Sequence, residues 1–213
     1  MRLIVPMILC LFAALTARAQ GERPGDFDYY VMALSWSADW CALTGDGRHD
    51  PQCAAGRGLT FILHGLWPQN DPSGYPSDCH SSFADPSRSD TAAMADIMSS
   101  SGLAFHEWQR HGRCSGLSSD DYFAAMRRAY ASITIPPLFS RVTTDLQVPP
   151  HVVEDAFLES NPTLDAGAVT VTCDQNLIQE VRICLTKDLS PRPCAADAAR
   201  ECPLSKAGLD AVR

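Results

Sequence analysis

The chain has 213 residues, which is enough for one domain with a buried core. Its formal net charge is −8, from 17 basic and 25 acidic residues. A protein that wraps a long nucleic acid usually presents a basic surface, so this charge excludes tight, non-specific binding of a polyanion over the whole molecule. Any anionic ligand would have to bind in a local cationic pocket.

The first 19 residues are predicted to be a secretory signal peptide. Arg2 supplies a positive start, an apolar run covers 3–15, and Ala17-Arg18-Ala19 fits a small-x-small cleavage site. The apolar run is too short for a membrane span. We therefore expect one domain over residues 20–213, located in a periplasm or secreted from the cell.

Nine cysteines are present, and Cys10 lies in the predicted signal segment. A lipid anchor at Cys10 is the competing interpretation, but Ile8-Leu9 lacks the small residue expected before a lipidated cysteine. The eight other cysteines form an even set, which in an exported domain indicates up to four disulfides. Spacing alone leaves their pairing open, and no pair has the spacing of a zinc ribbon.

Two strands are predicted early in the chain. Residues 27–36 (FDYYVMALSW) are aromatic and β-branched with partial alternation, as is typical of a strand. A short apolar run over 59–64 ends at Gly65 and predicts a second strand. The Pro-, Ser- and Asp-rich stretch 70–90 is predicted to be a long loop held by Cys79.

Four helices are predicted in the middle of the chain, over residues 89–100, 103–111, 119–132 and 149–160. Ser89 or Asp90 is expected to cap the first helix, and Ser118 or Ser119 the third. The fourth begins at a proline, a favoured first-turn residue.

Two further strands are predicted at 169–173 and 177–185, joined by a tight turn over 174–176. Residues 186–213 are predicted to be a coil-rich tail held by cysteines. Helices in the middle with strands at both ends predict an α+β fold, with a mainly antiparallel central sheet and several helices packed on it.

Chemically active side chains concentrate in FILHGLWPQ at 61–69 and FHEWQRHGRC at 105–114. His64 precedes Gly65 at the predicted strand end. A lone histidine there would more often be a structural hydrogen-bonding residue, so a catalytic role for His64 depends on the residues of the second segment.

That second segment combines two imidazoles, a carboxylate and a guanidinium. On a helix, Arg110 lies one turn from His106 and Glu107, and His111 lies one turn from Glu107. One surface can therefore present all four groups. The string HEWQRH is similar to the H-E-x-x-H zinc motif, but its second histidine stands at i+5, about 140° around the helix, where a zinc pair needs i+4. Three histidines could bind zinc in another geometry, but we expect no metal and no cofactor.

The same residues fit cleavage of a phosphodiester by an internal hydroxyl. That reaction needs a base for the 2′-hydroxyl and an acid for the leaving oxygen, and histidine has a pKa near working pH. It also needs positive charge around the crowded phosphate, which an arginine and a third histidine supply. Trp67, Trp108 and Tyr75 offer flat faces on which a base could stack, although core packing is an equally ordinary role for a tryptophan.

The chain resembles the ribonuclease T2 family. HGLWP at 64–68 resembles the family's first active-site motif, and HEWQRHGRC at 106–114 resembles the second, usually written H-E-W-x-K-H-G-x-C. YYVMALSWS at 29–37 is similar to the family's first strand, and VRICLTKD at 181–188 to its late strand. The resemblance covers essentially the whole chain beyond the signal segment.

The resemblance implies a role for each motif residue. His111 resembles the family's general base, His64 its general acid and His106 its phosphate-binding histidine. Glu107 and Arg110 occupy the positions that stabilise the charged transition state.

Other positions concern the substrate base and the departures from the family. Trp67 and Tyr75 resemble base-stacking residues. Gln69 stands where some relatives carry an acid that reads the base, which leaves base preference open, with low specificity expected. Arg110 stands where lysine is usual, and Arg113 stands where threonine is common and adds a cation beside the site.

The family pattern also implies four disulfides: Cys41–Cys53, Cys79–Cys114, Cys173–Cys202 and Cys184–Cys194. The second of them would tie the loop after the first motif to the end of the catalytic helix.

The resemblance implies a metal-independent, monomeric endoribonuclease. It would cleave single-stranded RNA by transesterification to a 2′,3′-cyclic phosphate and then form a 3′-phosphate. DNA lacks the attacking hydroxyl and is not an expected substrate, and no membrane contact is expected after signal cleavage. The alternative is a catalytically weak T2-like secreted scaffold that binds a partner without turnover. Its only support in the sequence is the acidic surface with the Arg110 and Arg113 departures, and the intact catalytic histidines argue against it.

Overall fold

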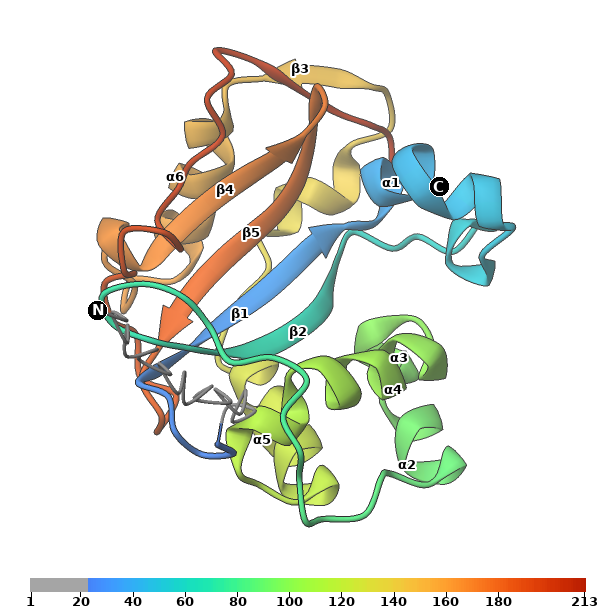
Figure 1. The fold of residues 1–213 in the computed structure, drawn as a ribbon. Helices are drawn as coiled ribbons and strands as arrows, with labels where there is room; N and C mark the ends of the chain where they lie inside the picture. The colour runs from blue at the N-terminus through green and yellow to red at the C-terminus, as the bar shows by residue number, and fades with distance from the viewer. Residues whose placement is uncertain (1–22) are drawn as a thin grey trace, which may run out of the picture.

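Residues 23–213 are described by the structure, which is a computed structural model; the predicted signal peptide lies outside this range. At its centre is a six-stranded sheet (Figure 1). The strands are β1 Tyr29–Trp36, β2 Phe61–Gln69, β3 Leu146–Val148, β4 Val169–Asp174, β5 Leu177–Leu185 and β6 Ala207–Leu209. Their order is β2-β1-β5-β6-β3, and β4 also pairs with β5.

The strand pairs of the sheet are antiparallel except the short contact between β5 and β6. This confirms the predicted α+β fold with a mainly antiparallel sheet. The predicted strands near the C-terminal end form as β4 and β5, joined by a turn in which Gln175 adopts a positive φ of 52°. The three-residue strands β3 and β6 were not predicted, and β6 lies within the stretch expected to be coil.

The helices are α1 Ser37–Trp40, α2 Arg88–Ala93, α3 Ala95–Met98, α4 Ser101–Arg110, α5 Ser119–Ala131 and α6 Pro150–Ser160. Single helical turns also form at Cys41–Gly45, Asp46–Arg48, Pro51–Cys53, Gly112–Ser115, Pro137–Arg141 and Ala166–Ala168. None of the helices within residues 23–213 has the length and apolarity needed to cross a bilayer.

The predicted helix 89–100 is wrong as a single element, because it forms as α2 and α3 with a break at Met94. The guanidinium of Arg127 donates to the carbonyl of Ala93, so the amide of Ile97 bonds instead to Met94 O at 3.2 Å. The cap also differs from the prediction. Ser87 caps α2 in a reciprocal capping box with Asp90.

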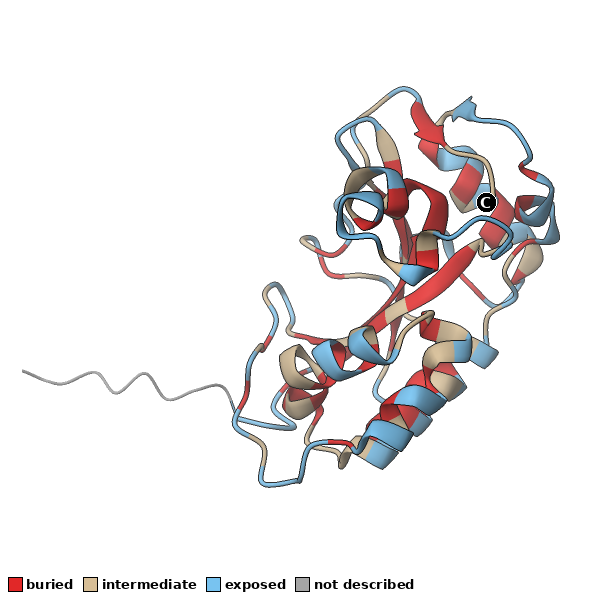
Figure 2. Cartoon of the chain, turned by 90° about the vertical axis from the view of Figure 1, so that its right-hand side faces the viewer, coloured by how far each residue is buried: buried red, intermediate tan, exposed pale blue. Residues whose placement is uncertain are grey.

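The main core lies between one face of the sheet and the helices. It includes Met32, Leu34 and Trp36 of β1, with Trp108 of α4 and Phe157 of α6. In Figure 1, helices α2 to α5 form one group beside β2, while α6 lies near β4. Figure 2 shows the buried residues along the strands and on the inward sides of the helices.

The opposite face of β1 carries Tyr29 and Val31, which pack with Cys184, Ala195 and Ala198 in a second, smaller apolar cluster. The tail after β5 therefore covers one end of this face.

Candidate active site

His64 lies at a β-bulge in the middle of β2. Ala33 of β1 pairs with Gly65, and the next residue, Leu34, pairs with Leu63, so His64 is the extra residue of the bulge. A bulge re-aims a side chain and is common next to active sites. The predicted strand end at His64 is wrong, since β2 continues to Gln69. The strand tolerates a proline after the bulge because β2 is an edge strand.

Helix α4 supplies the second group of side chains. The hydroxyl of Ser100 accepts the amide of Leu103 at 3.1 Å and caps the helix. Neighbouring residues on a helix point about 100° apart, and accordingly His106 is exposed while Glu107 is buried. His111 follows the last helical residue, with its amide still donating to Glu107 O at 2.9 Å.

Glu107 connects the helix to the bulged strand. Its Oε2 accepts Trp67 Nε1 at 2.7 Å, and its Oε1 lies 3.6 Å from His64 Nε2. Gly65 permits this approach, because a Cβ there would lie 2.0 Å from Glu107 Oε2. Burial raises the pKa of Glu107 to about 7, against the opposing effects of His64 and Trp67. The titrations of Glu107 and His64 are therefore coupled, because each group lies in the field of the other.

Sequence reasoning missed Glu180, which contacts His64 directly. Glu180 Oε1 lies 2.5 Å from His64 Nδ1, and Arg182 binds the other oxygen, with Nε at 3.0 Å and Nη2 at 2.9 Å. Burial by itself lowers the pKa of His64, but Glu180 and Glu107 outweigh burial and raise it above the ordinary value. The same contacts hold the pKa of Glu180 below its usual range despite burial.

His111 has the opposite surroundings. Its ring centroid lies 5.3 Å from that of Trp67 and 6.3 Å from that of Tyr75. Its Nδ1 is buried without a hydrogen-bond partner among the described residues. Burial, with the nearby charges of Arg110, His64 and His106, lowers the pKa of His111 to about 3. The imidazole is therefore neutral over the physiological range.

Arg110 forms an ion pair with Asp78 in the loop before Cys79. The loop is also held by the Asp78 amide, which donates to Arg110 O at 2.9 Å, and by the disulfide between Cys79 and Cys114. Arg113 does not add a free cation at the site, since it binds Asp85 at 2.7 Å.

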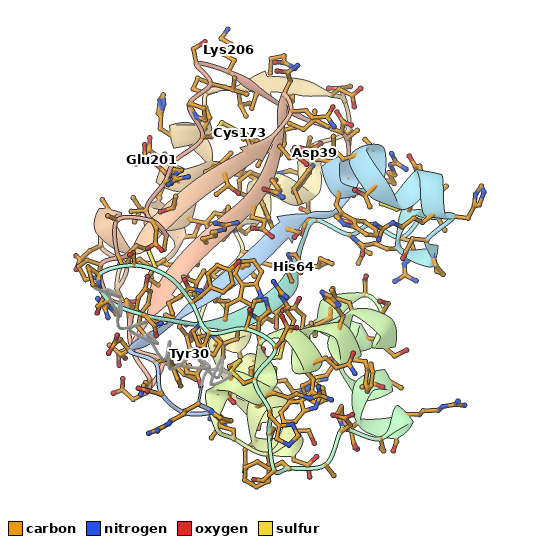
Figure 3. The ribbon with its side chains drawn as sticks, in the orientation of Figure 1. Tyr30, Asp39, His64, Cys173, Glu201 and Lys206 are labelled. Atoms are coloured by element: carbon orange, nitrogen blue, oxygen red, sulfur yellow. A yellow bond between two sulfur atoms is a disulfide. The ribbon has the colours of Figure 1, made fainter. Side chains whose placement is uncertain are left out.

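A cleft of about 420 Å³ brings most of the candidate residues together. Its polar and aromatic lining residues are Trp67, Gln69, Tyr75, Arg110, His111, Arg182, Asp197 and Arg200. His64 lies behind Trp67, with ring centroids 5.2 Å apart, and lines a smaller neighbouring pocket of about 60 Å³. In Figure 3 its side chain lies between the strands and the group of helices that contains α4. His106 lines neither pocket.

The tail contributes one wall of this cleft. Asp197 Oδ2 accepts the amide of Gly74 at 2.6 Å, which joins the tail to the loop that carries Tyr75. Gln69 is buried at the end of β2, and Tyr75 is 49% exposed. Trp67, Gln69 and Tyr75 therefore share one cleft. Trp108, whose face the sequence also offered for stacking, is fully buried in the main core and does not line this cleft. Within residues 23–213, no three His, Cys, Asp or Glu side chains are grouped so that they could hold a metal ion.

The four disulfides join Cys41 to Cys53, Cys79 to Cys114, Cys173 to Cys202 and Cys184 to Cys194. These are the pairs that the family pattern implies.

Comparison with known proteins identifies the family of the chain. The model of the ribonuclease T2 family matches residues 27–194. The chain belongs to the ribonuclease T2 family. Both motifs lie inside the matched region, as do Glu180 and Arg182. The T2 match ends before Asp197 and Arg200, so that part of the cleft wall lies outside it.

T2-family relatives include bacterial ribonucleases. The chain is 44% identical over 119 residues to "Ribonuclease" of Aeromonas hydrophila, covering 56% of this chain and 52% of that protein. It is 25% identical over 238 residues to "Ribonuclease I" of Escherichia coli (strain K12), covering 92% and 89%. For the first three curated relatives, the match spans about half of the relative's length.

Solved structures show the same fold. The RNase-related protein from Calystegia sepium matches with a TM-score of 0.69 at 21% identity, covering 88% of this chain and 98% of that chain. Trichomaglin, described as an S-like ribonuclease, matches with a TM-score of 0.68 at 19% identity, covering 88% and 100%.

Proposed function

We propose that the chain is a metal-independent endoribonuclease that cleaves single-stranded RNA in two steps. The observation that carries this proposal is the pair of histidines beside Trp67, whose surroundings shift their pKa values in opposite directions. His111 faces the cleft with its pKa lowered to about 3, whereas His64 is held between two carboxylates that raise its pKa. A base and an acid on the two sides of one phosphate are what internal transesterification needs.

In the first step, His111 takes the proton of the 2′-hydroxyl and the 2′-oxygen bonds to phosphorus. The bond from phosphorus to the 5′-oxygen breaks, and His64 gives its proton to that oxygen. The products are a 2′,3′-cyclic phosphate and a free 5′-hydroxyl. In the second step His64 takes a proton from water, whose oxygen bonds to phosphorus. The bond from phosphorus to the 2′-oxygen breaks, and His111 returns its proton to that oxygen, which leaves a 3′-phosphate and a free 2′-hydroxyl.

Arg110 supplies positive charge to the phosphate at the cleft, and His106 offers its imidazole as a hydrogen-bonding group from the exposed side of α4. Glu107 holds Trp67 through its indole N–H and lies close to His64. The flat faces of Trp67 and Tyr75, with the buried amide of Gln69, form a site for one base with low specificity.

The proposed setting follows from the signal segment and the disulfides. We propose a monomer that is exported to a periplasm or outside the cell, acts on RNA and not on DNA, and keeps no membrane contact once the signal is removed.

The deciding experiment incubates the purified domain, with disulfides intact, with a defined dinucleoside phosphate and with a single-stranded RNA in EDTA. Cyclic phosphate products that convert slowly to 3′-phosphates are expected, with matched DNA left intact. His151→Ala is a suitable control, because His151 is an exposed histidine on α6. RNA binding without product would support the scaffold alternative, and cleavage only with added metal would exclude the mechanism.

A further inference from the structure

Glu180 is a buried carboxylate that the reaction scheme above leaves without a role. It lies on β5, and its residue pairs with Ser35 of β1, so its side chain reaches across the middle strand to His64 on β2. The Ser35 hydroxyl donates to the same oxygen, Oε1, at 3.4 Å. The side chain is 2% exposed.

Arg182 completes the arrangement from the same strand. Its guanidinium holds Glu180 Oε2 through two nitrogens and lies 5.4 Å from the ring centroid of Trp67, on the wall of the cleft. A buried carboxylate is costly unless it is paired. A buried ion pair seldom adds net stability compared with apolar packing, so its presence calls for another reason.

The contact with Glu180 determines which nitrogen of His64 faces the substrate. A carboxylate at 2.5 Å from Nδ1 holds the Nδ1 proton and fixes the ring orientation. Nε2 then points away from the sheet, toward Glu107. Glu107 is a poor candidate for holding the ring, because its closest oxygen is 3.6 Å from Nε2 and its other oxygen binds Trp67.

We propose that Glu180 is the positioning residue for His64, and that Arg182 holds Glu180 in place, so that Nε2 carries the proton delivered to the leaving oxygen. This inference rests on the proposed function, in which His64 is the acid. The charged or titratable groups around His64 are Glu180 and Arg182 of β5, Glu107 of α4, and His111 after α4.

The test replaces Glu180 by glutamine, which keeps an acceptor for Nδ1 but removes the charge. In Glu180→Gln, the His64 resonance, assigned by its loss in His64→Ala, should titrate at least about one pH unit lower, in line with the effect of an adjacent opposite charge. The alkaline limb of kcat/KM should move in the same direction. Activity should fall by at least about 10-fold, mainly in kcat. Glu180→Asp should recover part of both effects.

Glu154→Gln is the matched control. Glu154 is a half-buried carboxylate whose Oε1 accepts the amide of Val171 at 2.9 Å, and no contact joins it to the described site residues. This variant should lower stability without moving the titration of His64. Arg182→Gln gives a second measurement if Glu180→Gln fails to fold, and the His64 pKa should change there too.

One outcome would overturn the inference. If Glu180→Gln lowers the melting temperature but leaves the His64 titration and the pH profile unchanged, the role of Glu180 is purely structural. The titration does not depend on turnover. If the wild type fails to cleave RNA while Glu180→Gln still shifts His64, the proposed function fails and the link between Glu180 and His64 stands.

Discussion

His64 and His111 both lie against Trp67, but their surroundings carry opposite charge. His64 comes from the sheet and lies between two buried carboxylates, whereas His111 follows a helix that brings Arg110 and His106 close to it. Burial lowers the pKa of both imidazoles. For His64 the carboxylates reverse the direction, and for His111 the cations reinforce it. In the proposed mechanism, the division into acid and base is therefore made by neighbouring residues and not by the imidazoles themselves.

The largest effect is expected from removing either ring. His64→Ala and His111→Ala should each lower kcat/KM by at least about 10²-fold, because general acid–base catalysis contributes roughly 10² to 10⁴. The double variant should be little worse than the worse single variant, since the two act as a unit. Initial rates on a dinucleoside phosphate measure this. Two simply multiplicative losses would contradict the shared role.

The pH dependence tests the same contrast without mutation. The base must be neutral, and the pKa of His111 is lowered to about 3, so activity should persist well into the acid range. The acid must be protonated, and the pKa of His64 is raised above 6.5, so activity should fall only as pH rises beyond that value. Profiles of kcat/KM from pH 3 to 9 check both limbs. An acid limb near the ordinary histidine value would contradict the surroundings described for His111.

Two of the disulfides can be removed separately, and their effects on stability and on activity can then be compared. Removing the Cys79–Cys114 bond with a double serine variant should cost about 2–5 kcal/mol of unfolding free energy. It should also lower kcat, because this bond holds the loop of Asp78 against the end of α4 beside His111. The Cys41–Cys53 pair is the comparison, since its loss should lower stability as well but leaves the loop of Asp78 tied to α4, so kcat in the folded fraction should fall less. Denaturant titrations and rates at low temperature distinguish these outcomes.

The smallest effect is expected at Asp78. Its ion pair neutralises Arg110 at the cleft, so Asp78→Asn should free the guanidinium for substrate phosphate. Both side chains are substantially exposed, which limits the gain to about fivefold in KM. KM at low and high salt measures it. A higher KM would show that Asp78 positions Arg110 and does not compete with the phosphate.

Much of the architecture follows from local patterns in the sequence. The alternation in β1, the turn before β5, the serine before α5 and the proline start of α6 each predict an element that forms. These signals depend on residues close together in the chain. The break between α2 and α3 has no such signal, because it depends on Arg127, more than 30 residues further along.

The site residues divide in the same way, into those with a local sequence signal and those placed by residues far away in the chain. His64, Glu107 and His111 stand in recognisable motifs, but Glu180 stands in an apolar strand where its contact with His64 spans 116 positions. The only local trace is a charged residue at every second position, Glu180 and Arg182, which also fits a solvent-facing strand edge. Strand order and register were needed to place Glu180 beside the bulge.

Gly65 has a consequence for the tolerance of the site to mutation. Its missing side chain sets the minimum spacing between β2 and α4, since a methyl group would occupy the place of a Glu107 oxygen and press on the indole of Trp67. No residue is smaller than glycine, so every substitution at this position would require a wider gap between strand and helix. A random library of the domain should therefore keep glycine here among its active members, even where the surrounding apolar residues are exchanged freely.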